Sequence, residues 1–416
     1  MKGKILEHLQ NYEIKGDRDY GGSWPTYDKG AVLIGKDEID SAKRVVSSKR
    51  LFRYDNRSIE NTEVGVFEND VCQLMNIKYC LATSSGTSAI TLALMGAGVI
   101  PGDEVICSSF GFPSTVSAIL LTGAKPVFVE VNENLHLDIE DLKKKITSHT
   151  RAVLMIHMRG QVGDVFNVLK VCKAANIPLI EDAVPTLGLR LGNQFTGTIG
   201  DFGAFSTQSD KSINTGEGGF VVTNDRKAFE KIILLSGAYE TRANAHFRDH
   251  KISLDERKYP LFNFRMDEVR AAIARPQVQK LLDRVAKLQR NYSFFVDALS
   301  NYTEVVIREP GVQGGNICDS MIFHIEGLDD YLITKAVEAL RSEGVDCRRF
   351  GGSSEFNARS FWNWHYAFPG LSENDIKKSL PASYQYINKA IDIPLSPLIG
   401  EKEIAIFNRA IRKVLG

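Results

Sequence analysis

Three short segments of the sequence carry side chains that could hold a small molecule and react with it. The first, Thr83–Ala89, reads Thr-Ser-Ser-Gly-Thr-Ser-Ala and comes just before an apolar stretch of helix length. A helix N-terminus presents unpaired N–H groups and the positive end of the helix dipole, so Gly86 and Thr87 could bind a phosphate there. An ordinary helix N-cap, which needs only one Ser or Thr, also explains these residues.

The second segment, Pro178–Asp182, is an apolar strand that ends in two acids, Glu181 and Asp182. Ligands of open α/β sheets lie beyond the carboxyl ends of the strands. Because side chains alternate along a strand, the two acids should point to opposite faces, and one of them could reach a ligand. A strand-end aspartate also commonly caps a following helix, so this segment alone does not decide between the two roles.

The third segment, Gly200–Gly219, places Lys211 between a predicted strand and a turn that contains Gly216, Gly218 and Gly219. A lysine in a protected loop can lose its charge through desolvation and act as a nucleophile. A solvated lysine beside a simple hairpin turn is the alternative.

Together the three segments meet the requirements of one cofactor, pyridoxal phosphate (PLP). This cofactor needs a lysine for a Schiff base, a cup for its phosphate and an acid that keeps its ring nitrogen protonated. Lys211, Gly86 with Thr87, and Asp182 supply these three at successive strand ends. Phe112, which follows another predicted strand, could cover the face of the ring. We therefore predict that Lys211 and Asp182 are catalytic.

The elements that would position these residues alternate between strand and helix from about residue 61. This alternation predicts an α/β domain at 61–275, with a largely parallel sheet covered on both faces. A polar arm with one short helix near 36–48 precedes it, and a smaller α+β domain at 276–416 follows, starting with a helix from Gln277 to about Asn301. The expected strands of the large domain are 104–108, 126–131, 152–157, 177–180, 203–207 and 219–223, and its expected helices are 88–97, 115–121, 139–146, 165–175 and 226–235.

Composition narrows the class of protein. A chain of 416 residues suits two domains, and its 51 basic residues balance 51 acidic ones, which gives no reason to expect nucleic acid as a partner. No apolar run reaches about 18 residues, so we expect no membrane span, and the N-terminus does not read as a secretory signal. The six cysteines have neither C-x-x-C nor zinc spacing, so we expect reduced thiols, no metal and a cytoplasmic location.

From about Val64 to the C-terminus, the chain resembles the DegT/DnrJ/EryC1/StrS family of PLP-dependent sugar aminotransferases. The resemblance implies an aspartate-aminotransferase-like fold (PLP fold type I), in which a large domain with a mixed, mostly parallel sheet is joined to a smaller α+β C-terminal domain. It also implies a homodimer with shared active sites. The matching blocks are Ser84–Ala89, Pro101–Val105, Glu181-Asp182, Gly200-Asp201, Phe205-Ser206, Lys211, Thr215–Gly219 and Asn263–Met266.

The resemblance implies a role for each matching residue. Lys211 would form the Schiff base and move protons, Asp182 would pair with the ring N–H, and Phe112 would stack on the ring. The remaining residues would bind the phosphate, namely Gly86, Thr87 and Ser206 in the same subunit and Asn263 in the neighbouring one.

Departures from the family pattern bear on the substrate. Pro185 stands where the family usually has a Gln that touches the ring hydroxyl, and Gly111 stands where Thr is common. Arg159 replaces a frequent Tyr and could either bind an anion or be a salt-bridged surface residue. Within the family, Leu51–Tyr54, His157-Met158 and Asn363–Tyr366 resemble the branch that aminates C8 of a keto-octulosonate. Trp362, Trp364 and His365 could line a sugar pocket or pack in the small domain.

The resemblance implies transfer of an amino group from L-glutamate or L-glutamine to a keto or aldehyde group of a sugar, sugar acid or cyclitol. A PLP-dependent lyase or dehydratase on the same scaffold is the alternative; the retention of Lys211 argues against the known sugar-dehydrating branch, which has His there. A PLP-binding sensor without turnover is a third reading, and the lack of a basic helical domain argues against it.

Overall fold

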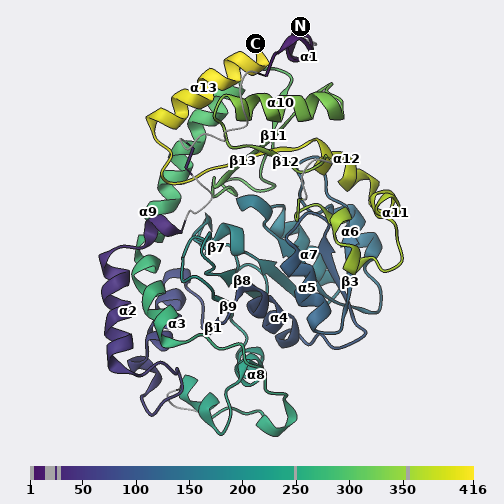
Figure 1. Cartoon of the computed structure of the whole chain (residues 1–416). Helices are drawn as coiled ribbons and strands as arrows, with labels where there is room; N and C mark the ends of the chain where they lie inside the picture. The colour runs from purple at the N-terminus through teal and green to yellow at the C-terminus, as the bar shows by residue number, and fades with distance from the viewer. Residues whose placement is uncertain (1–3, 15–23, 26–29, 248–250, 353–356) are drawn as a thin grey trace.

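The computed structural model describes residues 4–14, 24–25, 30–247, 251–352 and 357–416. These residues form a large lobe around one wide sheet and a smaller lobe that holds the first and last helices (Figure 1).

A seven-stranded sheet forms the centre of the large lobe, in the order β1-β9-β8-β5-β4-β2-β3. Neighbouring strands are parallel except at β9, which runs antiparallel to both β1 and β8. The prediction of a mixed, mostly parallel sheet is therefore confirmed. The strands are β1 (Tyr79–Thr83), β2 (Glu104–Ser108), β3 (Lys125–Val129), β4 (Thr150–Ile156), β5 (Leu179–Asp182), β8 (Phe202–Ser206) and β9 (Gly219–Thr223).

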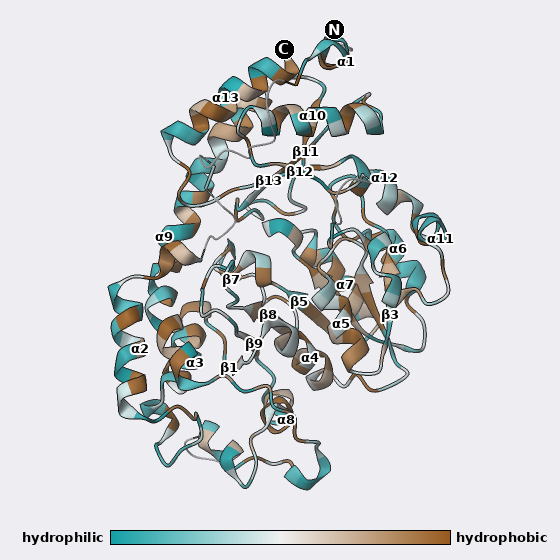
Figure 2. Cartoon of the chain, in the orientation of Figure 1, coloured by the Kyte–Doolittle hydropathy of each residue, from teal (hydrophilic) through white to brown (hydrophobic). Residues whose placement is uncertain are grey.

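Helices cover both faces of this sheet, which explains why its strands read as continuous apolar runs. In β4, Val153 packs with residues of α6 and α7, while its neighbour Leu154 packs on the opposite face with residues of α4, α5 and α8. The strands of the sheet are accordingly mostly brown in Figure 2. The helices of this lobe are α3 (Glu63–Met75), α4 (Gly86–Gly96), α5 (Pro113–Leu121), α6 (Ile139–Lys145), α7 (Val165–Ala174) and α8 (Arg226–Ser236), and a two-stranded hairpin joins β6 (Arg190–Leu191) to β7 (Gln194–Phe195).

The small lobe contains an antiparallel sheet in the order β10-β11-β13-β12. The first helix, α1 (Lys4–Asn11), adds Ile5 and Leu9 to the core of this lobe. Helix α2 (Lys36–Ser48), from the same predicted arm at 1–60, packs instead along α9. The other elements are β10 (Val305–Ile307), β11 (Ser320–Ile325), β12 (Arg348–Arg349), β13 (Ile391–Pro394), α10 (Asp330–Ser342), α11 (Glu373–Ser379), α12 (Pro381–Lys389) and α13 (Glu401–Leu415).

The long helix α9 (Glu268–Leu299) connects the two lobes and corrects one prediction. It begins nine residues before Gln277 and contains Pro276, although a proline inside a helix costs about 3 kcal/mol. Ala271 and Ala274, before Pro276, are buried in the core of the large lobe, and Val278 and Leu281 continue this buried face after it. The predicted limit at 275/276 therefore lies within a continuous helix, and the domain ranges stay predictions.

Among the helices of the described segments, none combines the length and the apolar character needed to cross a lipid bilayer.

Candidate active site

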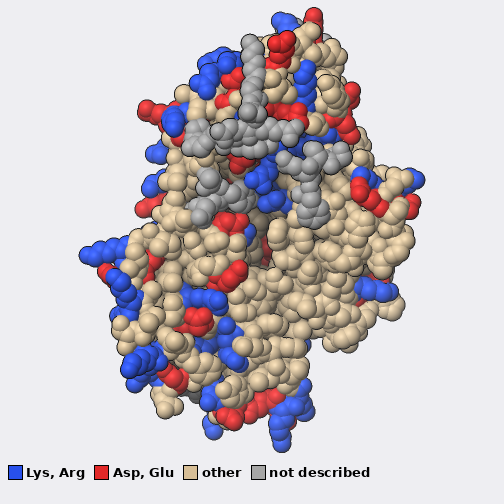
Figure 3. Space-filling model, viewed as in Figure 1, with Lys and Arg blue, Asp and Glu red and all other residues tan. Residues whose placement is uncertain are grey.

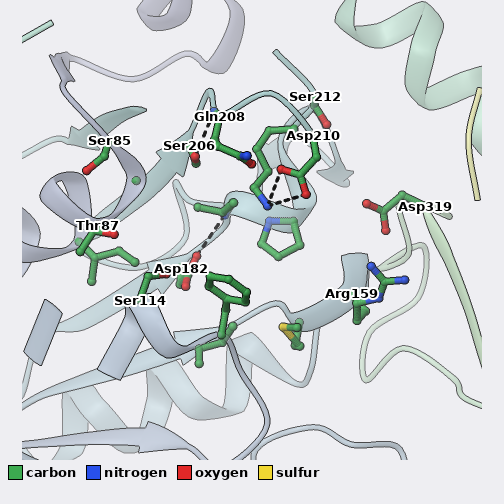
Figure 4. Close-up of a pocket in the computed structure, with 18 of the residues that line it drawn as sticks. Ser85, Thr87, Ser114, Arg159, Asp182, Ser206, Gln208, Asp210, Ser212 and Asp319 are labelled. Atoms are coloured by element: carbon green, nitrogen blue, oxygen red, sulfur yellow. Dashed lines mark hydrogen bonds and ion pairs between the residues drawn. The ribbon is translucent and has the colours of Figure 1, made fainter. Parts of the chain in front are cut away.

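A cavity of about 390 Å³ lies at the carboxyl ends of the parallel strands, where the two lobes meet. Its floor comes from residues that follow β1, β2, β4, β5 and β8, and its rim comes from α9 and the small lobe. Figure 3 shows Lys and Arg side chains gathered where this face of the molecule is hollowed between the lobes. Figure 4 shows Ser85, Thr87 and Ser206 on one side of the cavity, Arg159 and Asp319 on the other, and Asp182 and Asp210 between them.

Asp182 lies at the end of β5 and points into the cavity, while Glu181 points to the opposite face. Glu181 accepts hydrogen bonds from the backbone N–H groups of Gly197, Ile199 and Gly200, at 2.7–2.8 Å, and pairs with the buried His157 ring at 2.9 Å. The prediction that these acids take opposite faces is confirmed. Glu181 fixes the backbone, and Asp182 remains for a ligand.

The Asp182 carboxylate is held in a fixed position at the floor of the cavity. Its Oδ2 accepts a 2.7 Å hydrogen bond from the Thr115 hydroxyl, and its Oδ1 accepts a 3.3 Å hydrogen bond from the Val184 N–H. Burial raises the pKa of this carboxyl above its ordinary value, because its charge lacks solvation. A cation placed against it would reverse that effect, and a protonated ring nitrogen is such a cation.

The N-terminus of α4 forms a cradle beside this carboxylate. Ser85 caps the helix by accepting the Ser88 N–H at 3.0 Å, and Gly86 and Thr87 begin the first turn at the cavity wall. A Cβ added to Gly86 would meet the Cβ of Ser206 at 2.7 Å, so only glycine permits this approach between the helix and β8. The three predicted phosphate residues therefore meet where a helix dipole favours an anion.

Lys211 extends into the same cavity from the loop between β8 and β9. Its Nζ lies 3.2 Å from Oδ1 of Asp210, and about a third of its side chain remains exposed. Arg284 of α9 donates to the backbone carbonyls of Lys211 and Ser212, at 3.3 and 2.8 Å, and these hydrogen bonds fix the loop to α9. The Lys211 amine is therefore accessible from the cavity, while the backbone that carries it is anchored.

The wall next to Asp182 is apolar. Phe112 occupies the N-cap position of α5 and lines the cavity. Its side chain is 47% exposed, so it is free to stack on a planar ring bound there. Val184 and Pro185 line the wall near it. The departure at Pro185 therefore falls inside the site.

Arg159 lies at the rim and forms a salt bridge, but it is buried, so the expected surface position is wrong. Its guanidinium pairs with the buried Asp392 of β13, with Nη2 to Oδ2 at 2.6 Å and Nε to Oδ1 at 3.1 Å. Asp392 also accepts a 2.5 Å hydrogen bond from the Ser320 hydroxyl. Arg159 adopts a left-handed backbone conformation, with φ of 57°, which few residues other than glycine adopt. The pair joins the large lobe to the small one.

Four predicted residues lie away from this cavity. Asn263 is exposed on the loop before α9. Trp364 is buried in the core against Phe128 and donates its indole N–H to the Ala358 carbonyl, and its ring lies 3.7 Å from a Cβ added to Gly111. Trp362 packs on Tyr384, and His365 points to solvent. The tryptophans are thus placed by packing in the core.

Several lining residues escaped the sequence analysis. Ser114 lies two residues after Phe112, and its place after a predicted strand was a usable signal. Gln208, Asp210, Ser212 and Glu217 lie in the loop that carries Lys211. A further group comes from α9 and the small lobe, which carry no local motif, and it includes Arg284, Leu288, Asp319 and Arg359.

These observations fit PLP. A glycine-made cradle at a helix N-terminus suits its phosphate, a buried carboxylate suits its ring nitrogen, and an amine in the same cavity suits its aldehyde. The fold and the site define a PLP-dependent enzyme of the aspartate-aminotransferase type.

The chain belongs to the DegT/DnrJ/EryC1/StrS aminotransferase family, whose sequence model matches residues 34–412, and it is a PLP-dependent aminotransferase. It is 27% identical to GDP-perosamine synthase of Vibrio cholerae over 340 residues, which covers 81% of this chain and 87% of the relative. It is 27% identical to the spore coat polysaccharide biosynthesis protein SpsC of Bacillus subtilis, with coverage of 92% and 95%. Among solved structures, 3-amino-5-hydroxybenzoic acid synthase shares the fold with a TM-score of 0.78 at 24% identity, covering 94% of this chain and 97% of that one.

Proposed function

We propose that this protein transfers an amino group from L-glutamate or L-glutamine to a keto or aldehyde group of a sugar, a sugar acid or a cyclitol. The observation that carries the proposal is the presence of Lys211 and Asp182 in one cavity, beside the cradle formed by Gly86 and Ser206. Bound there, PLP supplies an electron-withdrawing ring that stabilises negative charge on the substrate carbon.

Each side chain of the cavity has a separate role in the proposed reaction. The Asp182 carboxylate holds the proton on the ring nitrogen, and Thr115 and the Val184 N–H orient that carboxylate. The Nζ of Lys211 removes the proton from the amine-bearing carbon of the donor, and returns a proton to the acceptor carbon in the second half of the cycle. Phe112 and Pro185 shield one side of the cavity from water.

Two relatives support a carbohydrate or cyclitol acceptor. GDP-perosamine synthase carries a sugar in its name, and a relative from Micromonospora echinospora, 28% identical over 80% of this chain and 77% of its own length, is a putative L-glutamine:3-amino-2,3-dideoxy-scyllo-inosose aminotransferase. The second name also supports L-glutamine as donor. The resemblance of Leu51–Tyr54, His157-Met158 and Asn363–Tyr366 to the branch that aminates a keto-octulosonate makes a sugar acid one of the acceptors to test.

A dehydratase is the second candidate, because the fold is shared with a GDP-4-keto-6-deoxymannose-3-dehydratase, at a TM-score of 0.74 and 21% identity. Pro185, at the cavity wall, is the feature of this chain that favours it.

Single-turnover mixing with one amino donor at a time separates the two candidates. With L-glutamate, transamination predicts stoichiometric 2-oxoglutarate and loss of the visible absorption of the lysine-bound cofactor. Addition of a keto-sugar should then restore that absorption and yield an amino sugar. Lys211→Ala is the matched control and should form no 2-oxoglutarate. A wild-type protein that converts no amino donor, yet removes water from a keto-sugar, would exclude transamination in favour of the dehydratase.

We also propose a homodimer in the cytoplasm. Asn263 is exposed and outside the cavity of its own subunit, which suits a residue that reaches the phosphate of a neighbouring subunit's cofactor. The six cysteines are free, which suits a reducing compartment. Sedimentation at low protein concentration tests the dimer, and Asn263→Ala should weaken cofactor retention only in the assembled form.

A further inference from the structure

Arg284, in the middle of α9, is a buried cation at the wall of the cavity. It is 4% exposed and lines the same cavity as Lys211 and Asp182. Burial lowers the pKa of its guanidinium to about 10, so the group is still charged at neutral pH. A buried charge is costly unless an opposite charge compensates it. Arg284 therefore needs an anion.

The acids of the described segments do not supply that anion by direct contact. Asp319 lines the same cavity and acts on Arg284 through its charge, but the two side chains form no ion pair. The other acids near the cavity are engaged with other cations, since Asp210 pairs with Lys211 and Asp392 pairs with Arg159. The charge of Arg284 is thus only partly compensated within the described residues.

The hydrogen bonds of Arg284 leave part of its guanidinium unused. Both of its hydrogen bonds in the described part of the chain come from Nη1, which donates to the carbonyls of Lys211 and Ser212 at 3.3 and 2.8 Å. Nε is buried and has no hydrogen-bond partner among the described residues. Nε and Nη2 form the side of a guanidinium that can donate two parallel hydrogen bonds to one carboxylate. Because Nη1 is bonded to the backbone of Lys211, an anion bound by Arg284 would lie beside the residue whose amine reacts.

The phosphate of the cofactor has its cradle on another side of the cavity. Figure 4 shows Thr87 and Ser206 of that cradle on the side opposite Asp319. Asp319 is the acid whose charge acts on Arg284. Arg284 therefore belongs to the part of the cavity that a substrate would occupy.

We propose that Arg284 determines substrate specificity by binding a carboxylate of the substrate with the N–H groups that its loop contact leaves unused. This inference rests on the proposed function and names a group that the substrate must carry. Both proposed donors, L-glutamate and L-glutamine, have a carboxylate on the amine-bearing carbon, and a sugar acid would bring one as acceptor. In each case the carboxylate supplies the negative charge and the acceptor oxygens that the buried guanidinium lacks.

Binding of glutarate tests the inference without turnover. Glutarate is a dicarboxylate with the carbon chain of L-glutamate, and glutaramide has nearly the same shape without charge. In calorimetric titrations of the PLP-loaded protein, Arg284→Gln should weaken glutarate binding about tenfold or more, as expected for the loss of a charge-assisted hydrogen bond, and should change glutaramide binding less. Arg284→Met is a second neutral variant for use if Arg284→Gln does not fold. A wild type that binds glutarate no better than glutaramide would overturn the inference.

Gln277→Met is the matched control for the loop. The Gln277 side chain of α9 exchanges two hydrogen bonds with Asn214, at 2.7 and 2.8 Å, so it anchors the same loop without a charge and without lining the cavity. Gln277→Met should retain glutarate binding. Arg284→Lys should recover part of it, because lysine restores the charge but not the planar fork. Equal losses in Gln277→Met and Arg284→Gln would show that Arg284 only anchors the loop, and would overturn the inference.

The two half-reactions identify which substrate brings the carboxylate. A slower reaction of Arg284→Gln with L-glutamate, followed by the visible absorption, would assign the donor. A slower reaction with a keto-sugar acid, but not with a neutral keto-sugar, would assign the acceptor. Rates equal to those of the wild type with all three substrates would overturn the inference. Glutarate binding that depends on Arg284, in a wild-type protein that converts no amino donor, would instead contradict the proposed function and retain the carboxylate site.

Discussion

The floor and the rim of the cavity both carry buried acids, but the two acids are satisfied differently. Within the described residues, the hydrogen bonds that Asp182 accepts at the floor come from neutral groups, Thr115 and the Val184 N–H, and no cation forms an ion pair with it there. Asp392 at the rim is paired with Arg159 and also bonded to Ser320. The Asp182 carboxylate is thus available to a cationic group in the cavity, whereas the Asp392 carboxylate is already paired with Arg159 and joins the two lobes. The next four predictions test this difference, from the largest expected effect to the smallest.

Lys211→Ala should remove the covalent attachment of the cofactor and lower the transamination rate by on the order of 10³-fold or more, since the variant lacks both the amine and the proton carrier. Borohydride reduction followed by peptide mapping should label position 211 in the wild type. The thermal stability of the cofactor-free variant should match that of the wild type, because Lys211 is partly exposed. A variant that retains the visible absorption would contradict the assignment.

Asp392→Asn should act on stability rather than on cofactor attachment. Removal of one partner of a buried ion pair leaves an uncompensated charge, and about 3–5 kcal/mol of unfolding free energy should be lost. Denaturant unfolding of the cofactor-free protein measures this loss. The double variant Arg159→Met with Asp392→Leu should lose less than Asp392→Asn alone. Equal stability of Asp392→Asn and wild type would show that the pair does not hold the lobes together.

Asp182→Asn should lower the transamination rate but raise the thermal stability of the cofactor-free protein. The ring nitrogen would lose its proton, and we expect a fall in rate on the order of 100-fold, the equivalent of about two pKa units at that nitrogen. Cofactor-free Asp182→Asn should melt at a higher temperature than wild type at neutral pH.

The sign of the stability effect follows from the raised pKa of Asp182 in the folded protein. Between its ordinary pKa and that raised value the folded state binds more protons than the unfolded state, so rising pH destabilises the wild type. Above this window the full cost of the buried charge is present, and below the ordinary pKa it vanishes. The melting temperatures of the wild type and of Asp182→Asn should therefore become equal in acid. A difference in melting temperature that is the same at all pH values would contradict a raised pKa.

Thr115→Val should produce the smallest change. It removes the 2.7 Å hydrogen bond to Oδ2 of Asp182 at nearly constant volume, so cofactor affinity should weaken by about 1–3 kcal/mol. Equilibrium dialysis of the cofactor measures the change. Thr186→Val is a suitable control, because Thr186 is also buried but bonds to the Ala183 carbonyl at 3.3 Å. A loss of equal size in both variants would point to a general effect of buried hydroxyls.

The sequence was most informative about elements of the large lobe. The strands at 104–108 and 219–223 and the helix at 36–48 have the predicted bounds, because each is a clear periodic run with polar or glycine flanks. Strand β1 and helix α3 were missed, since β1 is a short apolar run that joins directly to the small polar residues before α4. The predicted helix began only after Pro276, because a local rule against proline cannot weigh the burial of Ala271 and Ala274 before it and of Val278 and Leu281 after it.

The sequence by itself indicated six of the seven proposed cofactor residues that line the cavity, because they lie at the end of a strand, at the start of a helix or in the loop that follows a strand, and the sheet brings these ends to one edge; the seventh, Asn263, lies outside the cavity. The tertiary structure alone decided the rim. Arg284, Asp319, Arg359 and Asp392 come from segments that are distant in sequence, and only the packing of the small lobe on the large one brings them to the cavity or to Arg159. The same packing placed Trp364 in the core, since a buried aromatic ring is stabilised by whatever apolar neighbours the fold provides.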